Sequence, residues 1–258
     1  WWQFEGDAKD SSNNGHDGKL VNGVTFVDGL PSSSGKAAHF NGIDSLVEIR
    51  NRTGLRQETL SIELWFRSPQ PFDEKFWPGS ATLISTATSG PGSQDWLINA
   101  ASQNNKNEGR LLAETGPKGK QSDLYMTSRE GDPLNDGHWH HVVLTRHESG
   151  DAELFIDGLL HFQGNDGGGS VANDRAINLG GENVHPGGRF LDGDIDEVAI
   201  YDKILTPERI SAHYDAIAKH LPPRRPKQPR PSENPLALEP VTPLDSKIAG
   251  RAARHWAF

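Results

Sequence analysis

Short apolar segments separated by turn-forming residues dominate the chain up to about residue 200. Gly, Asn, Asp or Pro stands between them at intervals of roughly 8–20 residues, which is typical of strands joined by turns. The segments are AAHFNG, SLVEI, LSIELWFR, ATLISTAT, WLINA, RLLAE, HHVVLT, AELFIDG, AINLGG and IDEVAIY. Within LFIDGLLHF, Asp157 and Gly158 suit the positive-φ pair of a type I′ hairpin turn. The pattern predicts an all-β protein made of two antiparallel sheets.

One segment predicts a helix instead, TPERISAHYDAIAKH at 206–220. Thr206 is a favourable N-cap, Pro207 suits the first helical position, and Glu208 meets the positive end of the helix dipole. Apolar side chains then fall on one face of this helix, so it should lie against the sandwich. They are Ile210, Tyr214 and Ile217.

The composition changes near residue 220. The stretch LPPRRPKQPRPSENP at 221–235 is rich in proline and locally basic, so we expect an extended linker. The residues beyond it are too few to build a core of their own. We therefore predict one domain over 1–220, with 221–258 as a linker and the start of a following region. The alternative is a tail that packs back on the domain.

Overall composition narrows the function classes. The net charge of −9 argues against a sequence-independent grip on nucleic acid phosphates. No apolar run of about 18 residues is present, so no membrane span is expected. The absence of cysteine excludes disulfides and thiolate chemistry. The chain opens on WWQFEGD without a methionine, which we interpret as a processed or excised segment.

Three histidines in DGHWHHVVLTR (136–146) raise the question of a metal site. On a strand, His138 and His140 point to one face, whereas Trp139 and His141 point to the other. A zinc site needs three or four converging ligands, which this strand cannot supply alone. We therefore expect structural histidines that are hydrogen-bonded at the sandwich edge, with a metal site as the alternative.

The order of motifs resembles the laminin G-like jelly roll of the concanavalin A-like lectin and glucanase superfamily. The resemblance covers about residues 1–218 and is carried by WQFEGDAKDSSNNGHDGKLVNGVTF, AAHFNGIDSLVEI, LSIELWFR, DGHWHHVVLTR, LFIDG, INLGG and GDIDEVAIYDKILTPERI. It implies an all-β, two-sheet antiparallel jelly-roll sandwich with one short C-terminal helix. The terminal HWAF resembles the start of a cytochrome-associated domain in large secreted planctomycete-type proteins. This second resemblance implies a neighbouring domain after the linker and an extracellular or periplasmic location.

The acidic segment LDGDIDE (191–197) is the candidate calcium site. Its aspartates at 192, 194 and 196 would share one strand face, where like charges repel unless a cation or hydrogen-bond donors compensate. Related jelly rolls often hold a calcium ion between the first strand, the F-N-G turn and the late acidic strand. Carried over, this resemblance implies a structural Ca²⁺ held by carbonyls near Glu5 and Gly42 and by the side chain of Asp196. The alternative is that Asp196 accepts only backbone N–H groups.

An enzymatic function is tested by the carboxylate pattern. Glucanases of this superfamily use two glutamates flanking an aspartate on one strand. In DGDIDE the first carboxylate is an aspartate, and Glu197 directly follows Asp196 and so points to the opposite face. The G-x-S-x-G and H-E-x-x-H motifs are absent. We therefore predict that the chain is not an enzyme.

Binding is the remaining function. Sugars are held by polar side chains and by flat aromatic rings, and four residues of the polar segments could serve. They are Trp77, Trp96, Arg110 and Tyr125. We expect a non-catalytic recognition module for a glycan or a protein surface within a larger exported protein. The alternatives are a structural spacer without a ligand groove, and a glycoside-active enzyme of the same superfamily.

Overall fold

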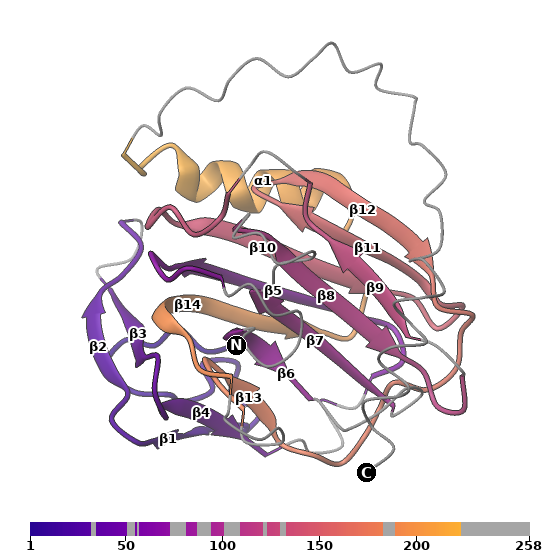
Figure 1. Cartoon of the computed structure of the whole chain (residues 1–258), viewed down its shortest axis with the longest axis horizontal. Helices are drawn as coiled ribbons and strands as arrows, with labels where there is room; N and C mark the ends of the chain where they lie inside the picture. Colours follow the sequence, from indigo (N-terminus) through magenta and orange to yellow (C-terminus); the bar gives the residue numbers. More distant parts are fainter. Residues whose placement is uncertain are drawn as a thin grey trace. The chain divides into compact units, whose positions relative to one another are not determined.

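The computed structural model describes residues 1–31, 35–50, 55, 57–72, 81–86, 94–100, 109–120, 123–129, 133–182 and 189–222. These residues form strands β1 to β14 and helix α1 (Figure 1). The strands are β1 Gly18–Val21, β2 Thr25–Asp28, β3 Lys36–Asn41, β4 Leu46–Ile49, β5 Leu60–Arg67, β6 Ala81–Ser85, β7 Asp95–Ala100, β8 Leu111–Gly116, β9 Leu124–Thr127, β10 His140–Arg146, β11 Asp151–Ile156, β12 Leu159–Asn165, β13 Ile177–Leu179 and β14 Asp192–Tyr201, and α1 is Pro207–Ala218.

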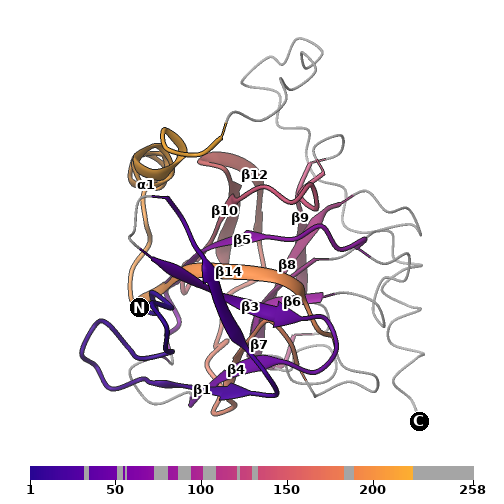
Figure 2. The ribbon, with the colours of Figure 1, turned by 90° about the vertical axis from the view of Figure 1, so that its left-hand side faces the viewer.

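The strands form two seven-stranded sheets. Sheet I has the order β1-β4-β13-β6-β7-β8-β9, and sheet II has the order β12-β11-β10-β5-β14-β3-β2. Every described pair is antiparallel, and many neighbours are distant in sequence, such as β13 and β4. The two layers are seen from the side in Figure 2. The predicted all-β jelly-roll sandwich with a single short helix is therefore confirmed within the described residues.

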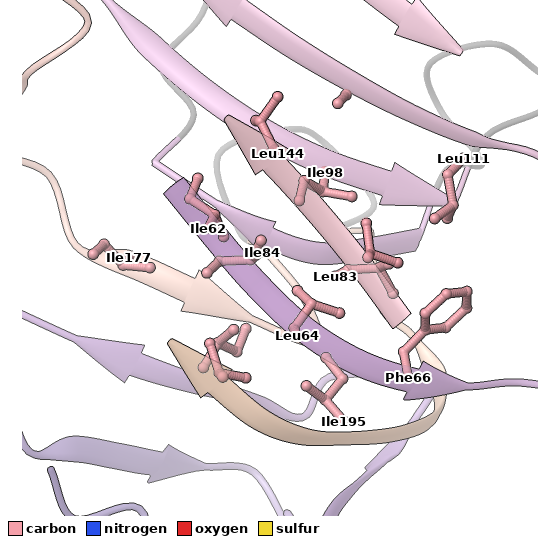
Figure 3. Packing of buried hydrophobic residues seen from close by; sticks show 14 of the residues in the cluster. Ile62, Leu64, Phe66, Leu83, Ile84, Ile98, Leu111, Leu144, Ile177 and Ile195 are labelled. Atoms are coloured by element: carbon pink, nitrogen blue, oxygen red, sulfur yellow. The ribbon is translucent and has the colours of Figure 1, made fainter. Parts of the chain in front are cut away.

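The hydrophobic core lies between the sheets. Along β5, residues 60, 62, 64 and 66 contribute to it because side chains two positions apart point to the same face of a strand. Side chains of the two sheets pack together in this core (Figure 3). Those labelled are Ile62, Leu64, Phe66, Leu144 and Ile195 of sheet II and Leu83, Ile84, Ile98, Leu111 and Ile177 of sheet I. This burial of two apolar faces supplies the main driving force for the fold.

Helix α1 packs on part of the outer face of sheet II. The Thr206 side chain accepts a hydrogen bond from the Arg209 amide, and Pro207 begins the helix, as predicted. The buried Ile210 packs with Val143 and Phe155 on that outer face. Further along the same helix face, Tyr214 and Ile217 pack against a cluster that contains Trp65 and Trp139.

Two backbone features set the direction of side chains at strand ends. In the β11–β12 hairpin, Asp157 and Gly158 have φ angles of 52° and 76°, as a type I′ turn requires. The pairing of β14 with β5 shifts register between Asp196 and Ala199, and Glu197 there has a φ of 50°. This bulge changes the pleat at the acidic segment.

The predicted linker falls almost entirely outside the described residues, which end at Pro222. Its extended conformation and the following region therefore stay predictions. Among the described residues, no helix has the length and apolar character needed to cross a bilayer.

Candidate functional site

A row of facing side chains crosses the outer surface of sheet I. The register pairs each member with the next across all seven strands, so the row spans about 29 Å at about 4.8 Å per strand. Its members are Lys19, Glu48, Asn178, Ser85, Leu97, Glu114 and Tyr125, and all except Leu97 are polar. We call this set the polar row. Its middle is buried, whereas Lys19 and Glu48 are exposed and Tyr125 is partly exposed.

Three carboxyl groups meet at the β8 end of the polar row. A Cβ added at Gly116 would lie 2.6 Å from an Asp123 oxygen and 2.8 Å from an Asp95 oxygen, so these two carboxyls flank the same glycine. Burial, together with the charges of Asp95 and Asp123, raises the pKa of Glu114 well above its usual range. The Tyr125 hydroxyl lies 3.4 Å from Asp123, and burial raises the pKa of Tyr125 as well.

The neighbouring charges on this face are paired. Arg189 lies 3.1 Å from a carboxylate oxygen of Glu182, and both side chains are almost completely buried. The Ser85 hydroxyl of the polar row donates to Glu182 over 3.3 Å. The centre of this face is thus buried, and the accessible donors and acceptors of the polar row lie towards its ends.

The structure separates the four residues expected to bind a ligand. Trp77 lies outside the described residues. Trp96 is 3% exposed and belongs to the core between the sheets, because it alternates on β7 with the outward-facing Asp95; this leaves no exposed ring face for a sugar. Arg110 is also buried, and its guanidinium donates to the Ser128 carbonyl and the Thr127 hydroxyl. Of the three expected residues that the structure describes, Tyr125 alone lies at the accessible end of the polar row.

The expected calcium ligands lie at different places along β14. Glu5 lies close enough to Asp196 to raise the pKa of that carboxyl. Gly42, however, packs against Asp192, which precedes Asp196 by four strand residues, or about 13 Å. The Asp196 oxygens accept hydrogen bonds from the amides of Leu30 and Glu197. No group of three metal-ligating side chains occurs in the described ranges, and calcium stays a prediction that rests on Asp196 and its acidic neighbours.

The histidines of DGHWHHVVLTR make separate contacts. His140 lies 3.1 Å from both Asp157 and Asp136, and it is buried. His141 faces the other side of the sheet, where its Nε2 lies 2.7 Å from a Glu63 oxygen. Strand alternation therefore sends the two adjacent rings to different networks, as expected for structural histidines.

Sequence reasoning missed most of the polar row. Lys19, Glu48 and Asn178 come from segments that are far apart in sequence, and none of them belongs to a recognisable motif. Strand alternation alone could have placed Glu48 on an outer face, because it stands between the apolar Val47 and Ile49. No local sequence pattern indicates which of these strands pair with one another.

Solved structures with a similar fold include two that are described as follows. The binding domain of Paraclostridial Mosquitocidal Protein 1 aligns with a TM-score of 0.65 and 16% identity, covering 81% of this chain and 49% of that one. Domain 4 of AbnA, a GH43 extracellular arabinanase from Geobacillus stearothermophilus in complex with arabinotriose, aligns with a TM-score of 0.57 and 22% identity. This second alignment covers 82% of this chain and 93% of that domain.

Sequence comparison adds a curated relative and a family. Over 150 residues the chain is 27% identical to the rat (Rattus norvegicus) "Sushi, von Willebrand factor type A, EGF and pentraxin domain-containing protein 1". This match covers 53% of the chain but spans only 4% of the relative, and it lends no support to a planctomycete-type parent. The Laminin_G_3 model, described as concanavalin A-like lectin/glucanases superfamily, matches residues 41–211. The chain therefore belongs to the Laminin_G_3 family of the concanavalin A-like lectin/glucanase superfamily.

Proposed function

We propose that this chain is a non-catalytic carbohydrate-recognition module that binds glycans on the outer face of sheet I. The accessible members of the polar row carry the proposal, because Lys19, Glu48, Asn178 and Tyr125 place hydrogen-bonding groups on one surface. Sugar hydroxyls both donate and accept hydrogen bonds, and such a surface offers them partners of both kinds. The outer face of sheet II, by contrast, lies partly under α1.

Family membership and fold support the same class of function. One of the two similar structures is titled a binding domain, and the other holds arabinotriose. The second is described as part of an extracellular enzyme, and we extend the same exported location, extracellular or periplasmic, to this chain.

The buried acids favour recognition over catalysis. Hydrolysis of a glycoside needs two carboxyl groups on either side of an accessible bond. Glu114 and Asp95 are 5% and 2% exposed, so this pair contributes to the buried network of the sheet instead of flanking a bound chain.

A glycan array tests the proposal. The chain should bind a subset of plant, microbial or animal oligosaccharides, with arabinotriose included among the probes. Asn178→Ala and Tyr125→Phe alter the outer face of sheet I, and at least one should weaken binding several-fold through the loss of a hydrogen bond. Gln163→Ala, on an exposed position of sheet II, is the matched control. Silence of the unmodified chain on the array would favour the spacer, and release of reducing ends would favour the enzyme.

A further inference from the structure

A hollow opens on the outer face of sheet I at its β1 edge, where the loop at 10–18 meets β1 and β4. Its lining residues are Gly15, His16, Asp17, Lys19, Glu48 and Arg50. We call it the β1 hollow. Lys19 and Glu48 are directly paired across the two strands and begin the polar row. Asn178, on the next strand, follows Glu48 in that row.

The loop that walls the β1 hollow is held in place by its own hydrogen bonds. The Asp10 carboxylate accepts from the Ser12 amide at 2.9 Å and from the His16 amide at 3.1 Å. Asp17 in turn accepts from the Asp10 amide at 2.9 Å. The indole of Trp2, which is itself buried, donates to the His16 carbonyl at 2.8 Å. The wall is therefore pre-organised, which reduces the entropy lost when a ligand binds.

The charged lining has hydrogen-bonding capacity to spare. Among the described residues, the side chains of Lys19, Glu48 and Arg50 make no hydrogen bond or ion pair, although Lys19 and Glu48 face each other across the strands. The buried Nδ1 of His16 likewise has no hydrogen-bond partner within that part of the chain. The accessible hydrogen-bonding groups of the hollow are therefore the side chains of Lys19, Glu48 and Arg50.

The balance of charge points to the chemistry of the ligand. Two cations, Lys19 and Arg50, stand against two carboxylates, Asp17 and Glu48. The charges of these four side chains cancel, so neither an anionic nor a cationic ligand gains a net charge attraction. An uncharged polyhydroxy ligand can donate to the carboxylates and accept from the basic groups at once.

Burial limits how far a ligand extends along the polar row. Beyond Asn178 the next members, Ser85, Leu97 and Glu114, are at most 5% exposed. A glycan seated in the β1 hollow therefore finds no accessible side chain of the polar row on the three strands after Asn178. We infer that the β1 hollow recognises one uncharged sugar unit at the end of a glycan chain, an inference that rests on the proposed function.

Calorimetric titration of the full chain tests this inference. The probes are neutral oligosaccharides of two to six units, arabinotriose among them, and uronic acid-bearing and sulfated oligosaccharides of equal length. Glu48→Gln and Arg50→Ala should each weaken binding of the neutral probe at least tenfold. The matched controls, Glu148→Gln and Lys203→Ala, alter exposed charges outside the hollow and should leave the affinity unchanged. Titration of the neutral probe should also move the NMR signals of the His16 ring.

The outcomes separate the two proposals. Tenfold losses in both hollow variants, with a moving His16 signal and preference for neutral probes, support the inference. Binding restricted to acidic probes overturns the assigned sugar class. Unchanged affinity in both hollow variants, with a loss in Tyr125→Phe, overturns the β1 hollow and leaves the proposed function standing. Failure of the unmodified chain to bind any probe overturns both. The charged side chains that are changed are exposed and Tyr125 is partly exposed, so melting temperatures equal to that of the unmodified chain show that folding is intact.

Discussion

At the scale of single residues, Asp196 combines burial with acidic neighbours. Its side chain is completely buried on β14, and burial raises its pKa to about 7, with Glu197 and Glu5 adding to the rise. The amide hydrogen bonds from Leu30 and Glu197 oppose this effect and offset only part of it. The ionised form of Asp196 is thus destabilised in the folded protein.

The first prediction concerns pH. Because the folded pKa of about 7 exceeds the ordinary value of 3.8, the free energy of unfolding should fall as pH rises from about 4 to about 7, by about 4 kcal/mol at most. Urea unfolding with chelator present, between pH 5 and 7.5, measures this slope. Asp196→Asn should flatten it, whereas Asp192→Asn, at an exposed position of the same strand, should not. Equal slopes in all three proteins would contradict the prediction.

The second prediction concerns calcium. A cation beside Asp196 would stabilise its ionised form and offset the repulsion from Glu5 and Glu197. At pH 7.5, calcium should therefore raise the melting temperature and a chelator should lower it. Asp196→Asn should abolish this response, and Asp192→Asn should retain it. A melting temperature that stays the same when chelator is added would rule out the calcium site.

At the scale of elements, the Glu63 side chain links its own strand β5 to β10, β14 and α1. From β5 it contacts His141 of β10 at 2.7 Å, His213 of α1 at 2.9 Å and the hydroxyl of Tyr201 of β14 at 2.7 Å. Burial alone would raise the pKa of Glu63, but these partners lower that pKa to about 2. This network secures the predicted contact between the helix and sheet II.

The third prediction follows from this lowered pKa. Since it lies below the ordinary 4.5, the stabilisation from Glu63 is complete above pH 4.5 and is lost as pH falls towards 2. Glu63→Gln should therefore cost about 3 kcal/mol at neutral pH and should weaken the acid dependence. Chemical unfolding at pH 7 and pH 3 measures both effects. Glu148→Gln, an exposed carboxylate, is the control, and equal losses in the two variants would refute the role of Glu63.

A second element-scale contact fixes the glycine-rich segment at 164–170. Arg146 of β10 and Asp166 form a two-point ion pair at 2.7 and 3.2 Å, with neither side chain exposed. Arg146 also donates to the Gly169 carbonyl. The glycines at 167, 168 and 169 all have positive φ, a conformation that they adopt without steric cost.

The fourth prediction is that Arg146→Met destabilises the domain by about 3–5 kcal/mol, because it leaves a buried carboxylate without its partner. Hydrogen exchange should accelerate at 165–170. Lys36→Met removes an exposed pair with Asp28 and should cost about 1 kcal/mol or less. A similar cost in both variants would argue against the special role of the buried pair.

At the scale of the whole molecule, the sandwich comprises one compact unit, Trp1–Leu221. The proline-rich stretch after it was predicted to be an extended linker. Limited proteolysis should therefore cut first between 221 and 235, since extended, exposed chain is the preferred substrate of proteases. Mass spectrometry of the early fragments locates the cut. First cleavage within 1–220 would contradict the domain boundary.

The two levels of the fold were predictable to different degrees. The strands, the hairpin at Asp157 and the cap at Thr206 follow local rules, and all three were expected from sequence. Two of the expected binding residues, Trp96 and Arg110, are buried instead. They were chosen by residue type alone. Whether a tryptophan or an arginine is buried depends on which face of its strand meets the other sheet.

The sequence by itself determined the two-layer β architecture, because alternation and turn chemistry act within a few residues. Only the tertiary structure decided the outer face of sheet I. Lys19, Glu48 and Asn178 become neighbours through strand register, which depends on how distant apolar faces pack together. Burial of those faces selects the pairing, and the pairing then brings together polar side chains that no local pattern connects.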